Sequence, residues 1–240
     1  MAIARDATSG VVVGSATGSL TTAHTISGSD RALIVHCLSN NGSNPITGVT
    51  YNGTSMTKLS TFTRTGESFP VDQYGIAAPD TGTNNVVITA SGSAVCVETG
   101  ISYTGVDQTT PFPTTSTAIG NSATISDSLT VSASNSWIFA GTRTGGAQPS
   151  ATGTNYTRQV SNASNGVHAG DSNAGLATGS QTVSVSVTSG SWGIAIIEIA
   201  EAGAATSSIS SITSVAQASI TSYLGVANAS IASVNGIANS

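Results

Sequence analysis

The sequence predicts an all-β fold: an antiparallel β-sandwich with jelly-roll-like connections, followed by a C-terminal repeat segment of short strands and turns. Three observations lead to this prediction. Short apolar or alternating runs recur along the chain between turn clusters rich in glycine and asparagine. No segment before residue 200 shows the 3.6-residue period of an amphipathic helix. Serine, threonine, glycine and asparagine together make up 116 of the 240 residues, and these residue types disfavour helix interiors.

The first elements follow from local patterns. Residues 31–38 form a continuous apolar run that begins after Asp30 and ends at an Asn-Asn-Gly cluster, which is typical of a buried central strand. Residues 46–51 and 55–62 flank Asn52-Gly53. Because an Asn-Gly pair supplies the two positive φ angles of a type I′ turn, these segments are expected to pair as a hairpin.

The later elements show alternation. Val95, Val97, Thr99, Ile101 and Tyr103 lie on one face of a strand at 94–103, and residues 182–188 alternate in the same way. The other predicted strands are residues 71–78, 85–90, 129–133, 137–140 and 192–200.

The composition changes after Glu201, which is the last charged residue. We therefore expect two parts: a β-sandwich domain at 1–202, and at 203–240 a segment for assembly or oligomerisation. This segment contains three consecutive copies of an 11-residue unit, at 208–218, 219–229 and 230–240.

Apolar residues occupy the second, fifth and eighth places of each copy. They are Ile209, Ile212, Val215, Ile220, Tyr223, Val226, Ile231, Val234 and Ile237. Eleven residues also make three helical turns and would give a right-handed supercoil. The serine, threonine and β-branched content and the Asn235-Gly236 pair favour strand–turn–strand units, but the spacing alone leaves both alternatives open.

These nine residues are the predicted assembly interface. A thin uncharged segment has too little neighbouring mass to bury them within one chain, although each large apolar side chain gains about 1.5–3 kcal/mol on burial. Stacked repeats need neighbours to complete a core. We therefore expect a homo-oligomer, with a trimer preferred because three segments can bury their apolar rows around one axis.

The composition and the apolar runs also exclude two classes of partner, nucleic acids and membranes. The chain has 6 lysine and arginine residues and a net charge of −5, which cannot neutralise a nucleic-acid backbone. Its apolar runs are far shorter than the roughly 20 residues of a membrane-spanning helix. The N-terminus lacks the pattern of a signal peptide. A chain made in the cytoplasm yet with an extracellular type of surface suggests a virion component.

No motif for catalysis or for a cofactor is present, so we expect a non-enzymatic protein without cofactor or metal. His24, His36 and His168 share no ligand spacing and are expected to have packing roles. Glu98 and Glu198 lie within apolar strands, where we expect pairing with an arginine or exposure on an outer face; a glycosidase would need them to face each other. Residues 171–173 resemble only part of a calcium loop.

Two other residue types leave alternatives open. Cys37 and Cys96 lie in apolar runs. They are expected either to be buried free thiols or to form a disulfide between paired strands. Trp137, Trp192 and Tyr156 are the aromatic residues that could stack on a sugar, which gives the alternative function of a carbohydrate-binding adhesion module. Both tryptophans, however, occur in strand patterns typical of a core.

The runs 46–57, 74–88 and 103–112 resemble jelly-roll modules of bacteriophage structural proteins and bacterial surface proteins, and the repeat resembles units at the ends of phage virion proteins. The resemblance implies a virion structural protein without catalytic residues. A capsid decoration or head-fibre protein is favoured over a tail or baseplate protein. Its implied partners are capsid or tail subunits and a glycan of the host surface.

Overall fold

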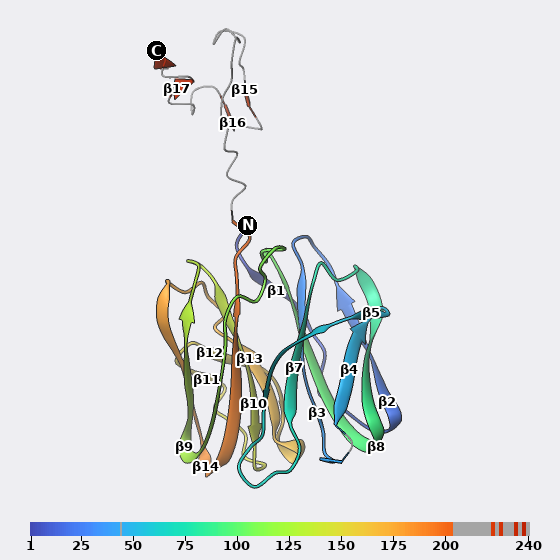
Figure 1. Cartoon of the computed structure of the whole chain (residues 1–240). Helices are drawn as coiled ribbons and strands as arrows, with labels where there is room; N and C mark the ends of the chain where they lie inside the picture. The colour runs from blue at the N-terminus through green and yellow to red at the C-terminus, as the bar shows by residue number, and fades with distance from the viewer. Residues whose placement is uncertain (44, 204–221, 224–225, 228–232, 235–236, 239–240) are drawn as a thin grey trace. The chain divides into compact units, whose positions relative to one another are not determined.

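The structure, a computed structural model, describes residues 1–43, 45–203, 222–223, 226–227, 233–234 and 237–238. The chain divides into two units, Met1–Ala202 and Gly203–Ser240. The strands of the first unit pair only in antiparallel fashion, in two large sheets (Figure 1). The predicted all-β antiparallel sandwich is therefore confirmed.

The first unit has two halves that lie side by side (Figure 1). The first half contains β1 (Ala4–Thr8), β2 (Val12–Ile26), β3 (Ala32–Ser39), β4 (Ile46–Tyr51), β5 (Thr54–Ser55), β6 (Thr57–Phe62), β7 (Val71–Ala77) and β8 (Gly82–Thr104). Its sheet has the order β5-β4-β8-β3-β7-β6, and β1 and β2 also pair with β8.

The second half contains β9 (Thr115–Val131), β10 (Trp137–Thr144), β11 (Thr152–Gly153), β12 (Tyr156–Asn162), a 3₁₀ turn η1 (Ala163–Asn165), β13 (Val167–Asp171) and β14 (Gly179–Ile199). Its sheet has the order β11-β12-β13-β10-β14-β9.

Alternating residues of the central strands lie in separate cores. Ile34 of β3 and Phe139 of β10 both belong to a core between the halves, which also takes residues from β8 and β14. The intervening residues point the other way, because successive side chains of a strand lie on opposite faces. Leu33 of β3 thus lies in a core within the first half, and Ile138 of β10 lies in a core within the second.

The two halves repeat one order of elements. β2, β3, β4, β6, β7 and β8 correspond to β9, β10, β11, β12, β13 and β14, with equivalent pairings in the two sheets. The unusual backbone conformations repeat as well: the six non-glycine residues with positive φ in the described chain fall in three equivalent turns of each half. These residues are Asp30 and Asn135, Asn52 and Asn155, and Ala78 and Asn173. The halves are two copies of one topology.

Comparison with the predicted elements shows which strands and turns can be predicted from local sequence patterns. The strand at 31–38 is confirmed as the fully buried β3, and the turn at Asn52-Gly53 is confirmed with φ of 47° and 78°. The predicted pairing of 46–51 with 55–62 is confirmed only next to this turn, because β4 pairs with the two-residue β5 and the longer β6 pairs with β7. The separate strands predicted at 85–90 and 94–103 are wrong, because β8 continues through Ser91-Gly92-Ser93. Likewise β14 joins 182–188 to 192–200, and a register shift between Ser186 and Gly190 lets it bend.

The second unit contains two short hairpins among its described residues. β15 (Ser222–Tyr223) pairs with β16 (Val226–Ala227), and β17 (Ser233–Val234) pairs with β18 (Ile237–Ala238). The two hairpins have the same internal register and lie 11 residues apart in sequence. The rest of the repeat lies outside the described residues, so the repeat as a whole stays a prediction.

Candidate functional site

A buried ion pair joins the two halves. Asp171, at the end of β13, is fully buried, and both its oxygens accept hydrogen bonds of 2.8 Å from the Arg5 guanidinium of β1. The Tyr103 hydroxyl donates to the same carboxylate at 3.4 Å, and the Asn173 amide oxygen also accepts from Arg5. The partial calcium loop at 171–173 therefore holds an arginine, and its role is to brace β13 against β1.

A second ionic brace lies at the other edge of the contact. The Glu67 carboxylate, between β6 and β7, accepts from Arg64 at 2.8 Å and from Arg143 of β10 at 2.6 Å. All three side chains are largely buried. Because bidentate and shared arginine–carboxylate contacts are stronger when water is excluded, this cluster fixes the 63–70 loop on the second half.

Glu98 and Glu198 are both fully buried, so the expectation of arginine pairing or surface exposure is wrong. The Glu198 carboxylate accepts from the hydroxyls of Thr114, Ser132 and Ser136 at 2.8–3.1 Å and from backbone N–H groups of the 132–133 turn. It thus stabilises the turn before β10. The two glutamates bond to separate residue sets in separate halves.

Glu98, on β8, has a poorer environment. The Ser9 hydroxyl donates to its Oε1 atom at a long 3.5 Å, and its Oε2 atom has no hydrogen-bond partner among the described residues. Burial raises the pKa of Glu98 to about 7, because a carboxylate loses its hydration there and gains little in exchange. The ionised form of Glu98 therefore destabilises the folded first half, by an amount that depends on pH.

The three histidines are buried, in agreement with the predicted packing roles. His36 Nδ1 accepts from the Gln73 amide at 2.9 Å, and Nε2 then donates to the Thr142 carbonyl at 3.3 Å. Burial lowers the pKa of His36 to about 4 and that of His168 to about 3. Both rings are therefore neutral at pH 7, and they sit in different halves.

Cys37 and Cys96 are buried free thiols, which resolves the alternative left open by the sequence. Burial raises the pKa of both thiols, that of Cys37 strongly, since the nearby Asp72 and Glu98 also disfavour a thiolate. Unreactive thiols of this kind act as small apolar side chains.

All three candidate aromatic platforms are buried. The Trp192 indole donates to Ser122 at 3.1 Å. Trp137, which is 9% exposed, packs edge-on against Tyr103 and borders a hollow of about 360 Å³ together with Asn135 and Glu201. Neither the side-chain amide of Asn135 nor the Glu201 carboxylate bonds to another described residue. Trp137 is thus the predicted platform that borders a hollow, although little of its ring is exposed there.

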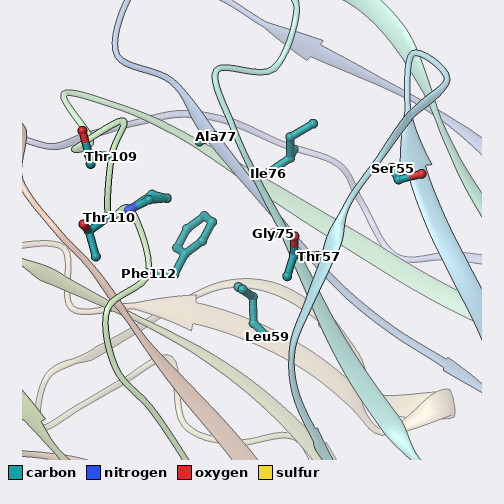
Figure 2. Close-up of a pocket in the computed structure, with 10 residues that line it drawn as sticks. Ser55, Thr57, Leu59, Gly75, Ile76, Ala77, Thr109, Thr110 and Phe112 are labelled. Carbon is teal, nitrogen blue, oxygen red and sulfur yellow. The ribbon is translucent and has the colours of Figure 1, made fainter.

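A groove that the sequence did not predict lies at the junction of the halves (Figure 2). Its volume is about 350 Å³, and it separates the 109–112 linker from the start of β6. The residues that line it are Ser55, Thr57, Leu59, Gly75, Ile76, Ala77, Thr109, Thr110, Pro111 and Phe112. A Cβ at Gly75 would approach Leu59 and Phe112 to 2.6 Å, so glycine is required where these side chains meet.

The predicted assembly interface is described only in part. For four of its residues the backbone pairing is described: Tyr223 lies opposite Val226, and Val234 lies opposite Ile237. The other five residues lie outside the described residues: Ile209, Ile212, Val215, Ile220 and Ile231.

Comparison of the chain with protein families, with curated proteins and with solved structures finds no match in any of the three. Within the described residues, no group of three or more histidine, cysteine or acidic side chains is placed to hold a metal ion. The described residues also form no helix long and apolar enough to cross a bilayer.

Proposed function

We propose that this protein is a non-enzymatic structural component of a virion, with its β-sandwich displayed on the particle and its C-terminal repeat joining chains together. The observation that carries the proposal is the uncharged 11-residue repeat with nine regularly spaced apolar residues. A homotrimer is the preferred assembly, and capsid or tail subunits are the other partners. A capsid decoration or head-fibre role is preferred over a tail or baseplate role.

The contacts of the body support this proposal. Two of the acidic groups that the sequence offered for chemistry are occupied in structural bonds: Asp171 with Arg5, and Glu198 with turn hydroxyls. Two ionic braces and a shared apolar core hold the halves together. A rigid, weakly charged body of this kind suits display on a particle.

Self-association of the full chain tests the assembly role. We expect size-exclusion chromatography with light scattering to give a trimer mass for the wild type. The triple variant Ile209→Asp, Ile220→Asp and Ile231→Asp should give a monomer, because each charge falls on a predicted interface position. The matched control places the same three charges one residue later, at Ser210, Thr221 and Ala232, and should stay trimeric. A monomeric wild type would contradict the proposal.

A carbohydrate-binding adhesion module is the second candidate. It is favoured by the hollow that Trp137, Asn135 and Glu201 line together, since sugar-binding sites combine an aromatic side chain with polar groups. A glycan array probed with the full chain tests it. A positive spot should be lost in Glu201→Gln and retained in Glu67→Gln, which lies elsewhere; an empty array dismisses this function.

A further inference from the structure

The strands β6 and β7 separate before β7 ends. β7 pairs with β3 along its whole length, up to Ala77 opposite Ala32. It pairs with β6 only as far as Gly75, which lies opposite Thr57. The preceding N–H, that of Met56, donates instead to the Val49 carbonyl of β4 at 2.9 Å. The chain before β6 has therefore turned away from β7 toward β4. Ile76 and Ala77, the last two residues of β7, form an open sheet edge.

The open edge presents one free pair of backbone groups. The Ala78 N–H donates to the Arg31 carbonyl at 2.9 Å, so these two residues form a hydrogen-bonded pair. Hydrogen-bonded and non-bonded pairs alternate in an antiparallel ladder, so the N–H and C=O of Ala77 point away from β3. No described residue bonds to them. Ala77 is one of the residues that line the groove of Figure 2.

The groove beside this edge is apolar inside and uncharged. Leu59, Ile76 and Phe112 supply its apolar surface, and threonine hydroxyls lie at its rim (Figure 2). A second hollow, of about 140 Å³, shares Ser55, Ile76 and Ala77 with the first and continues past the end of β7 to Asp80. Asp80 supplies the only charge among the residues that line the two hollows.

The equivalent edge in the second half is closed. β12 pairs with β13 up to Asp171, the last residue of β13, through Thr157. The shared topology therefore does not require an opening, and the opening in the first half comes from the separation of β5 from β6. A free edge next to an apolar hollow is the arrangement that strand addition uses.

We infer that this groove binds an extended segment of another polypeptide, which adds as a strand to the outer edge of β7. Its backbone bonds to the N–H and C=O of Ala77, and a large aliphatic side chain fills the hollow between Leu59 and Phe112. Antiparallel addition places the N-terminal part of the segment near Asp80. The complementary segment therefore carries a lysine or arginine two or three residues before the aliphatic residue.

A binding measurement on the full chain tests this site independently of the C-terminal repeat. The probe is a fluorescein-labelled, end-capped peptide with one lysine two residues before one isoleucine in a serine and threonine background. Fluorescence anisotropy should rise saturably, and replacing the peptide's isoleucine or its lysine with serine should weaken binding. No saturable binding up to millimolar protein concentrations overturns the proposal.

Two protein variants locate the bound peptide. Ala77→Pro removes only the outward N–H, and proline is tolerated on a sheet edge, so affinity should fall about tenfold, the worth of one hydrogen bond. Ala77→Ser keeps the N–H and should bind like the wild type. Asp80→Asn should weaken the lysine peptide and leave the serine-substituted one unchanged. Equal affinity of Ala77→Pro and Ala77→Ser, or no effect of Asp80→Asn, would overturn the site.

Discussion

The two halves of the body solve one structural problem with different residues. In the second half, Glu198 of β14 accepts from the Ser132 N–H and hydroxyl and so stabilises the turn before β10. In the first half, the residue equivalent to Glu198 is Ser102, because each lies opposite the second residue of the central strand. The carboxylate comes instead from Asp6 of β1, which accepts from the Ser27 N–H at 2.9 Å and from Ser102 at 3.0 Å.

This difference shows which features the topology requires. The apolar alternation and the positive-φ turns recur in both halves, whereas the acid at this turn is supplied by whichever strand reaches it: Glu198 is fully buried and Asp6 is partly exposed. The N–H and hydroxyl donors of the turn are satisfied in both halves, but not from one fixed position. The predictions below test how far the halves depend on each other and on their own polar groups.

The largest effect is expected at the brace between the halves. Asp171→Ala leaves the Arg5 guanidinium without its carboxylate, and breaking a buried pair by removing one partner should cost about 3–5 kcal/mol of unfolding free energy. Urea denaturation of the full chain measures it. The matched comparison is Asp72→Ala, which removes the buried acid of the pair with Lys58 inside the first half. The charge left behind is then the Lys58 ammonium, whose side chain is 42% exposed against 23% for Arg5, so this loss should be smaller, and equal losses would contradict the role of the brace.

Sequence patterns predicted the individual strands better than their connections. The fully buried β3 and the Asn52-Gly53 turn follow from rules that act over a few residues. The continuity of β8 across Ser91-Gly92-Ser93 does not, because β2 pairs with β8 on both sides of this segment and accommodates it by a register shift between Ser93 and Thr89. The repetition of the halves was also missed, although Thr25-Ile26-Ser27 and Thr130-Val131-Ser132 precede equivalent central strands.

The sites were less predictable than the strands, since they depend on contacts distant in sequence. The sequence indicates Asp171 only as part of a calcium loop, because no residue near it shows that its partner is Arg5, which lies 166 residues away in the chain. The groove beside β7 depends on where β6 leaves its partner, and no residue type marks that point. The burial of Glu98 and Glu198 within apolar runs was visible, but their polar partners were not.

A pH dependence is expected from the poorly bonded acid of the first half. The pKa of Glu98 is about 7 in the folded chain and near 4.5 when unfolded, so between these values the folded state holds a proton that the unfolded state has lost. Stability therefore falls as pH rises from 4.5 to 7, by about 3 kcal/mol at 1.4 kcal/mol per unit.

Glu98→Gln tests this dependence, because it removes the titration. The variant should gain stability relative to the wild type as pH rises from 4.5 to 8, and comparing the two chains cancels the opposing titration of the histidines. Thermal or urea unfolding at both pH values measures the gain. A difference between the chains that does not change with pH would contradict it.

The smallest effect tests the contact between equivalent positions of the two halves. His36 and Gly141 both lie four residues after the start of their central strands, β3 and β10. A Cβ at Gly141 would stand 2.5 Å from His36 Nδ1, so one large side chain is accommodated only because its counterpart has none. Gly141→Ala should therefore cost about 1–3 kcal/mol by overpacking. Gly48→Ala, whose Cβ meets nothing within 4 Å, is the control and should be close to neutral.

The double variant His36→Ala and Gly141→Ala should recover part of the loss, because the removed ring makes room for the new methyl group. A Gly141→Ala chain as stable as the Gly48→Ala control would show that the halves tolerate a shift at this contact.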